Sequence, residues 1–485
     1  MKRRVLALLL AALPLCGLAA EHTDAATNAP DLPDRAQVLD ALRSSPTVRA
    51  AGAQIEAEEA RARRLDAGPH EWTVRLTDQQ RRVRTAPDAR YNEWNVAVER
   101  ALRLPGKGQL DRQLGAAGIA SAKIGRGDAL HEASRGLLAG WFDWLREEAG
   151  ADQWRRQRDI LARQAKVVQR RVELGDAPRL ERLQADAALA QAEAQLAQTL
   201  GRAQVAAEAL RRLYPALTLP AAVPETAPVA VDGDGAAWIA AIMEHNHELG
   251  VARAESARAR IGANRADAER RPDPSVGAHM ARDRDGEERI VGLSLSIPLA
   301  GAGRRADADT AVALAEASSW REAGVLRRVE AEAAALHRRT RAAHAGWQSQ
   351  QAAADALGRS ADLTERAWQL GEGTLAETLN ARRLAHEARL AARLAGLDAA
   401  EARYRLLLDA HRLWPLDMDD DERGEHDHPL APRRGECSPM RLPSLSANIA
   451  MKPISGLSSV FGISTVPPAA TARAKGTPRS APPSR

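Results

Sequence analysis

The sequence predicts a mainly α protein with a small β part, built from two internal repeats. Of the 485 residues, 45% are hydrophobic but only 3% are aromatic. Such usage is typical of long helices that pack through small side chains, and it disfavours a compact enzyme with an aromatic pocket. The most informative observation is a duplication with a period of roughly 200 residues, in which similar blocks recur in the same order.

The first 20 residues predict a signal peptide. Three basic residues precede an apolar run from Val5 to Leu15, and small residues suited to cleavage follow. The run is too short to cross a bilayer as a helix. Cys16 leaves a lipoprotein as the alternative, although Leu15 stands where a small residue belongs. The net charge of +5 comes from basic residues in this segment and from position 423 onward, whereas the rest of the chain is mildly acidic. The net charge therefore does not indicate nucleic-acid binding.

The two repeats are assigned to residues 21–220 and 221–415. Two pairs of matching blocks show the duplication best. They are Ser45–Ala51 with Asn246–Ala252, and Leu174–Ala185 with Leu370–Ala381. A tail over 416–485 begins with acidic residues and histidines and then becomes rich in Pro, Ser, Ala and Arg, which is typical of disorder.

Each repeat predicts the same order of elements. A first helix, over 34–66 or 234–270, ends near a proline and is followed by two strands. A very long helix comes next, and a Gly-marked break separates it from a final helix. The long helix over 107–174 would span roughly 100 Å, about the length of two shorter helices stacked end to end.

The predicted strands alternate between apolar and polar residues. Trp72, Val74 and Leu76 share one face of the first strand, and later strands repeat the pattern, with charged links around 81–90 and 283–288. A half-buried soluble hairpin explains one such pair well. Two pairs that follow an export signal favour the hairpins of an outer-membrane barrel.

No motif predicts an enzyme or a cofactor site. His131-Glu132 and His386-Glu387 resemble the start of a zinc-protease motif, but Arg135 and Leu390 stand where its second histidine belongs. The pair His245 and His247 and an acidic, histidine-bearing patch over 417–428 offer metal ligands. Solvated polar residues are the favoured explanation of both, and we assign no metal site.

These features resemble the TolC family of outer-membrane efflux channels over roughly residues 34–415. The resemblance rests on the segments Val172–Asp176 and Trp368–Glu372 and on the strand ends around Pro105 and Pro298. The phrase LRLPGK over 102–107 is more similar to the heavy-metal (cobalt–zinc–cadmium) branch than to the drug branch.

The resemblance implies a homotrimer in the outer membrane of a Gram-negative bacterium. Four strands from each protomer would close a barrel in the outer-membrane lipid, and the helices would continue as a barrel through the periplasm. The implied function is the passive exit duct of a tripartite pump for metal cations or small toxic compounds, with a periplasmic adaptor and an inner-membrane pump as partners. The alternatives are a duct for type I protein secretion and a periplasmic coiled-coil adaptor or scaffold.

The resemblance also implies the candidate site residues. Glu181 and Glu377 would narrow the periplasmic mouth with acidic rings, and Asn380 stands where the family often has a further acid. A solvated helix face is the alternative for these residues. The adaptor would dock on the two turns between long helices, at Leu174, Gly175, Asp176, Leu370, Gly371 and Glu372.

Overall fold

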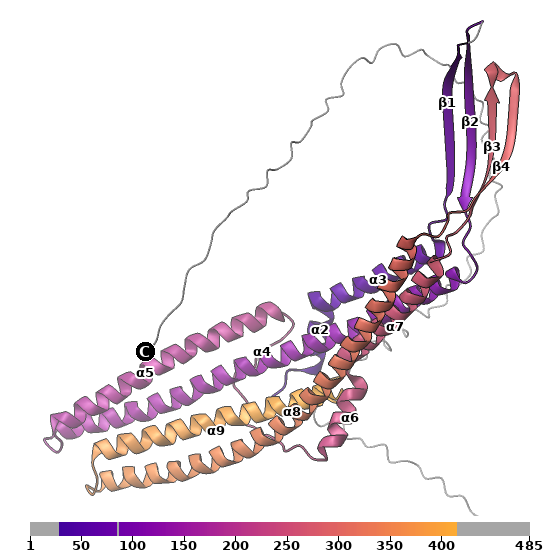
Figure 1. Ribbon diagram of the computed structural model, residues 1–485. Helices are drawn as coiled ribbons and strands as arrows, with labels where there is room; N and C mark the ends of the chain where they lie inside the picture. The colour runs from indigo at the N-terminus through magenta and orange to yellow at the C-terminus, as the bar shows by residue number, and fades with distance from the viewer. Residues whose placement is uncertain (1–28, 85–86, 415–485) are drawn as a thin grey trace, which may run out of the picture. The chain divides into compact units, whose positions relative to one another are not determined.

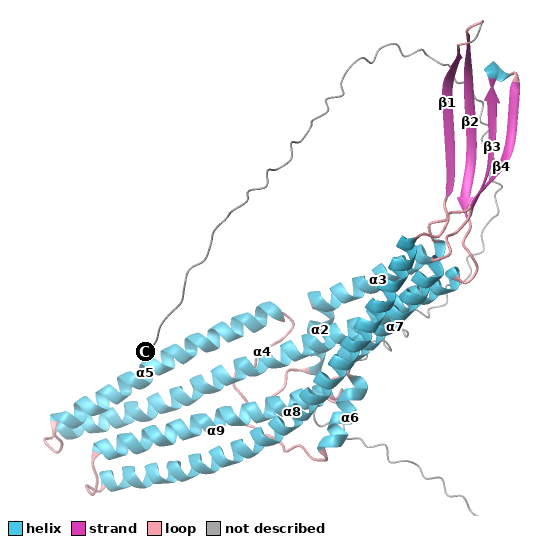
Figure 2. Cartoon of the chain, viewed as in Figure 1, coloured by secondary structure: helices cyan, strands magenta, loops and turns pink. Residues whose placement is uncertain are grey.

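The computed structural model describes residues 29–84 and 87–414 (Figures 1 and 2). The predicted signal peptide with Cys16, the 417–428 patch and the rest of the tail lie outside them. The first set of elements is α2 (Arg35–Ser44), α3 (Pro46–Ala67), β1 (Trp72–Val83), β2 (Ala89–Ala101), α4 (Lys107–Glu173) and α5 (Arg179–Leu213). The second set is α6 (Gly235–His245), α7 (His247–Glu269), β3 (Ser275–Asp283), η1 (Arg284–Gly286), β4 (Glu288–Ser296), α8 (Ala302–Gln369) and α9 (Leu375–Asp409). The expected mainly α fold with a small sheet is confirmed.

The first helix of each set is divided in two, so the continuous helices predicted over 34–66 and 234–270 are wrong. Ser45 breaks the first with a ψ of 128°, because the following Pro46 disfavours a helical conformation in the residue before it. Asn246 breaks the second, and its side chain accepts a hydrogen bond of 2.7 Å from the Leu249 N–H as the cap of α7.

Two very long helices organise the chain. α4 has 67 residues and α8 has 68, each roughly 100 Å long. Each turns back into an antiparallel partner, which gives the hairpins α4–α5 and α8–α9 (Figure 2). A glycine allows one close approach, because a Cβ at Gly115 would lie 2.8 Å from the Ala62 Cβ of α3. Within the described residues, no helix is long and apolar enough to cross a bilayer.

The largest group of aromatic residues forms a core at the middle of α4. Trp141 is only 2% exposed there, and its indole N–H donates to the carbonyl of Asp31 at 2.9 Å. The Tyr404 hydroxyl of α9 is 2.7 Å from the Asp31 carboxylate. This core therefore joins α4, α9 and the segment that precedes α2.

The four strands form one antiparallel sheet in the order β1-β2-β3-β4. The predicted link over 81–90 is shorter than expected, because ion pairs carry both strands further. Arg81 pairs with Glu93 at 2.6 Å, and Arg82 pairs with Asp88 at 2.6 Å. Cross-strand pairs of opposite charge can thus extend a hairpin beyond the part in which apolar and polar residues alternate.

A buried ion network joins the sheet to the helices. Lys107, at the start of α4, is only 2% exposed and lies 2.9 Å from the carboxylate of Asp273. His70 contacts the same carboxylate at 3.0 Å, and the Leu104 N–H donates to it at 3.0 Å. Burial raises the pKa of Asp273, but the bonds from Lys107, Leu104 and His70 outweigh it and lower the pKa. Asp273 is therefore ionised, and its carboxylate links the sheet to the start of α4.

Candidate functional site

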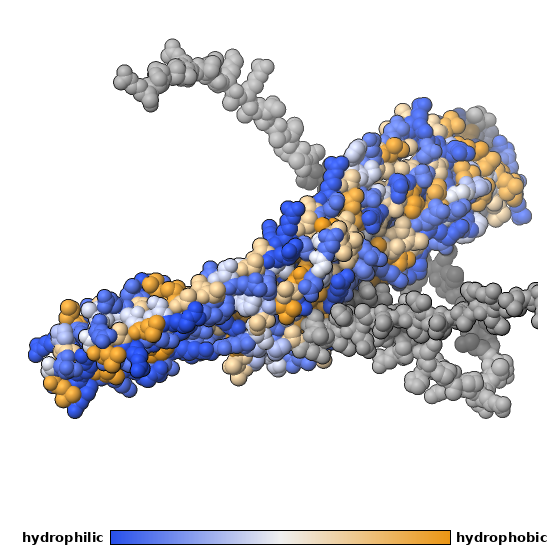
Figure 3. Space-filling model, turned by 90° about the horizontal axis from the view of Figure 1, so that it is seen from below, coloured by the Kyte–Doolittle hydropathy of each residue, from blue (hydrophilic) through white to orange (hydrophobic). Residues whose placement is uncertain are grey.

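One face of the sheet carries exposed apolar side chains. The hydrogen-bonded register places them in three successive rows. These rows are Trp72–Arg100–Val276–Leu295, Val74–Val98–Ala278–Leu293 and Leu76–Val96–Met280–Val291. Arg100 is the one charged residue in them, and its guanidinium lies over the Trp72 ring, 5.3 Å from its centre. Leu293 is 89% exposed and Leu76 is 74% exposed. In Figure 3, which looks from below, hydrophobic and hydrophilic surface lie side by side at the end of the molecule that carries the strands. Exposed apolar surface of this extent marks a contact with lipid or with another protein.

Two tryptophans bracket these rows. Trp72 lies in the first row, and Trp94 lies on the same face opposite Asp78, beyond the third row. Their rows are roughly 20 Å apart at about 3.4 Å per residue. The apolar band of a membrane barrel is about 25 Å tall and is flanked by aromatic residues. The other face is polar and includes an Arg75–Glu99 ion pair of 3.1 Å, so the two faces suit lipid and water.

The two hairpin tips make the same turn. Gly175 and Gly371 have φ of 75° and 80°, the left-handed conformation in which a side chain is disfavoured. The next N–H in each tip reaches back into the helix, from Asp176 to the Arg171 carbonyl at 2.8 Å and from Glu372 to the Ala367 carbonyl at 2.9 Å. This is the Schellman pattern that ends a helix. It leaves Leu174 and Leu370 at the apex, 68% and 67% exposed.

The tips are packed together by a small core around Trp368, a residue that was expected only as part of the family-like segment Trp368–Glu372. Trp368 of α8 is 5% exposed and shares a core with Val168 of α4, Ala185 of α5 and Leu375 of α9. The Arg171 guanidinium lies over the Trp368 ring, 5.3 Å from its centre. The docking candidates of both hairpins therefore belong to one structural unit.

The candidate mouth residue Glu377 caps its own helix. Its carboxylate accepts hydrogen bonds of 2.9 Å from the backbone N–H and from the hydroxyl of Thr374, and the Thr374 hydroxyl accepts from the Glu377 N–H. This capping box satisfies the first turn of α9. The hydrogen bond from the Thr374 N–H also lowers the pKa of Glu377, which keeps it charged. Asn380 is exposed one turn later and accepts from Arg383 at 3.0 Å.

Glu181 has different surroundings at the equivalent place in α5. It follows Pro178, which offers no side-chain cap, and it is half-buried. Within the described part of the chain, no hydrogen-bond donor reaches its Oε2. The structure thus brings the tips together but gives the two carboxylates unlike surroundings, because one caps its helix and the other is half-buried with one oxygen that has no donor among the described residues.

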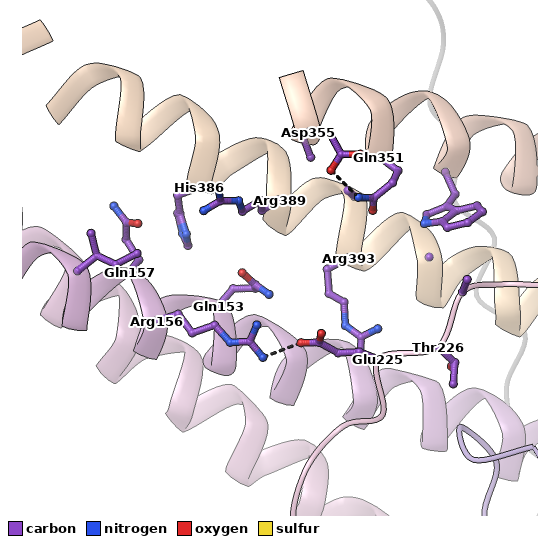
Figure 4. A pocket seen from close by; sticks show the side chains of 16 residues that line it. Gln153, Arg156, Gln157, Glu225, Thr226, Gln351, Asp355, His386, Arg389 and Arg393 are labelled. Atoms are coloured by element: carbon purple, nitrogen blue, oxygen red, sulfur yellow. Dashed lines mark hydrogen bonds and ion pairs between the residues drawn. The ribbon is translucent and has the colours of Figure 1, made fainter. Parts of the chain in front are cut away.

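A cleft of about 570 Å³ opens between the two hairpins (Figure 4). Arg156 of α4 pairs there with Glu225 of the α5–α6 connection at 2.6 Å. Arg393 of α9 donates to the carbonyl of Pro224. His386 also lines the cleft, and burial lowers its pKa to about 4, so it is neutral at physiological pH. These contacts fasten the connection to the hairpins and give the cleft a structural role.

Solved structures share this arrangement. The Campylobacter jejuni outer membrane channel CmeC is 12% identical, with a TM-score of 0.65 over 80% of this chain and 87% of its own. The transmembrane channel CusC is 14% identical, with a TM-score of 0.65 over 77% of this chain and 91% of its own. The Vibrio cholerae outer membrane protein VceC is 16% identical, with a TM-score of 0.64 over 77% and 95%. No protein-family model matches the chain, and no curated protein matches its sequence.

These likenesses establish the class of fold: the chain is built as outer membrane channels of this kind are built. The protomer fold implied by the resemblance to the TolC family, mainly helical with a small four-stranded sheet, is thereby confirmed. Its features here are a four-stranded sheet with an apolar face and two long helical hairpins whose tips pack together.

Proposed function

We propose that the chain is the outer-membrane channel of a tripartite efflux pump, a passive exit duct that an inner-membrane transporter drives. The observation that carries the proposal is the sheet, with an exposed apolar face and two open edges. An open edge in lipid leaves backbone groups unsatisfied, so the strands need partners. Three protomers would supply twelve strands and close the barrel, and the helical hairpins would extend into the periplasm toward an adaptor.

The oligomer can be tested at the strand edges. We would place one cysteine in β1 and one in β4, scanning their register in a Cys437→Ser background. Closure predicts disulfide-linked trimers in outer-membrane fractions, whereas matched pairs in the adjacent strands β2 and β3 should crosslink only within a chain. A protein that fractionates with the periplasm and gives no oligomer would instead support the adaptor or scaffold alternative.

The same background tests orientation. Cysteine in place of Asp285, at the β3–β4 turn, should react with an impermeant thiol reagent on intact cells, because this turn lies beyond the apolar rows. Cysteine in place of Leu174, at a hairpin tip, should be protected until the outer membrane is permeabilised. The reverse labelling would invert the proposed orientation.

The exported substrate is proposed to be a metal cation or a small toxic compound, and the mouth to be acidic. Replacing Glu181 and Glu377 by glutamine should reduce the cation preference of the channel in planar bilayers, because three copies of each carboxylate would converge in a narrow entrance. Glutamine still completes a capping box, so the α9 cap should survive. Glu193→Gln, on an exposed position of α5, is the control. Unchanged selectivity in the double variant would return both residues to a purely structural role.

A further inference from the structure

Three histidines from distant parts of the sequence meet beside α4. His131 lies in α4, His247 is the first residue of α7, and His411 follows the end of α9. One ligand nitrogen from each residue lies within 4.8 Å of the others. The ring centres are 6.0, 5.3 and 5.0 Å apart for the pairs His131–His247, His131–His411 and His247–His411.

The backbone adopts special conformations to bring these rings together. His411 has a φ of 54°, in the left-handed region that is unfavourable for a residue with a side chain. His247 lies against Gly127 of α4, where an added Cβ would be 2.6 Å from a carbon of the imidazole ring. The fold therefore accepts local strain at one histidine and leaves room in α4 for another.

A buried carboxylate supports the first imidazole. The Nε2 of His131, which is 4% exposed, lies 3.1 Å from the carboxylate of Asp409. Asp409 is held in turn by Arg135 at 2.9 Å and by Arg405 at 3.1 Å. Burial raises the pKa of Asp409, but the bond from His131 and the charge of Arg135 lower it to about 2. Carboxylates commonly orient metal-binding histidines in this way, through the nitrogen that does not bind the metal.

A fourth imidazole stands next to the three. The ring of His245 is 5.2 Å from that of His411, and its Nδ1 lies 3.1 Å from the Ala241 carbonyl. A backbone carbonyl on Nδ1 fixes the tautomer that leaves Nε2 able to accept a metal. The site thus has three ligands and one candidate for a fourth position that water could also fill.

We propose that His131, His247 and His411 form a binding site for a divalent transition-metal ion of the zinc class. Imidazole suits such borderline cations. Tetrahedral bonds of about 2.0–2.1 Å place ligand nitrogens roughly 3.4 Å apart, so the rings would close by about an ångström when the ion binds. The ion would clamp α4 to α7 and to the end of α9, and the proposal holds whether or not the chain is an efflux channel.

The test is metal titration of the full-length, metal-stripped protein with Zn²⁺, and with Co²⁺ as a spectroscopic probe. We expect one ion per chain at this site, a Co²⁺ spectrum of four-coordinate type and a rise in thermal midpoint with metal concentration. His247→Gln and His411→Gln should each abolish the spectrum. Asp409→Asn should weaken affinity by ~10–100-fold, as loss of an outer partner does.

Matched controls separate this site from the histidines of the tail. His344→Gln on α8 and the double variant His426→Gln/His428→Gln should leave the spectrum intact. Gly127→Ala should weaken binding by displacing His247, whereas Gly125→Ala, which has open space around it, should not. Circular dichroism would confirm that each variant keeps its helices. No binding by the folded parent, or binding that survives the cluster variants and disappears in the tail variant, would overturn the proposal.

Discussion

The two hairpin tips end α4 and α8 with the same turn but begin the next helices differently. Thr374 and Glu377 cap α9 reciprocally, whereas α5 begins after Pro178 without a side-chain cap. The second tip is thus stabilised by its own sequence. The first has no such cap. Its Arg171 pairs with Asp176 at 2.9 Å and lies over the Trp368 ring. Tips with the same turn can therefore differ in local stability. If a channel entrance opens by movement of one tip, we expect the first tip, which lacks the helix cap, to move.

The largest expected effect comes from removing the shared side chain. Trp368→Ala should lower the free energy of local opening by about 3–5 kcal/mol, because the ring is buried among all four helices. Amide hydrogen exchange in peptides over 165–185 and 365–380 would measure it. Trp320→Ala, at a position 67% exposed on α8, is the control and should change little. Faster exchange at the second tip alone would show that the tips are independent.

The next largest effect is expected at the glycines of the two tip turns. Because the two turns have the same backbone conformation, substitutions there should have the same effect at both tips. Gly175→Ala and Gly371→Ala should each cost about 1–2 kcal/mol, since both sites have open space and only the left-handed φ opposes a side chain. Gly201→Ala, in the interior of α5 with nothing nearby, should instead stabilise its helix. Local exchange rates would report all three. A cost at one tip only would mean that the turns are not equivalent.

A smaller effect is expected from the cap that only the second tip has. Thr374→Ala should cost about 1 kcal/mol of helix stability, because the first turn of α9 loses a hydrogen-bond acceptor. Pro178→Ser at the first tip should cost nothing or stabilise α5 slightly, since serine can supply the missing cap. Exchange in the first turns of α5 and α9 would measure both. If Thr374→Ala had no effect, packing alone would hold the second tip.

The smallest effect is the response of this cap to pH. Hydrogen bonds from Thr374 lower the pKa of Glu377 below its ordinary value of 4.5, so the ionised form favours the folded tip. That contribution is complete above the ordinary value and is lost as pH falls through the lower, folded value. Exchange rates corrected for intrinsic pH dependence should show the second tip weakening below about pH 4.5. Glu377→Gln should remove this dependence, and its persistence would assign the titration to another group.

Local sequence signals predicted the elements well where a particular residue type determines the backbone conformation. Gly175 and Gly371 marked the turns, and α4 ends at Glu173, one residue before the predicted boundary. The alternation of Trp72, Val74 and Leu76 gave the apolar face of β1, which the register confirms. The break at Ser45 was missed because the helical pattern continues across it, although Pro46 was the available signal.

Contacts between distant segments were not predictable in the same way. His245 and His247 were noted as candidate metal ligands without a site being assigned. Nothing local connects them with His131 or His411, which the packing of α4 and α9 brings close. The stacking of Arg171 on Trp368 likewise joins different hairpins. Glu377 was singled out for its charge, and its capping role could have been deduced from Thr374 three residues earlier.

In the proposed trimer, the open edges of the sheet would make entry into lipid a collective event. β1 and β4 each have one side without a partner strand among the described residues. A single protomer would expose a row of backbone groups to hydrocarbon, each costing several kcal/mol. Insertion and assembly would therefore proceed together, with a rate that rises steeply with protomer concentration. The supply of new chains to the membrane, more than the folding of each chain, would then set how fast finished channels accumulate.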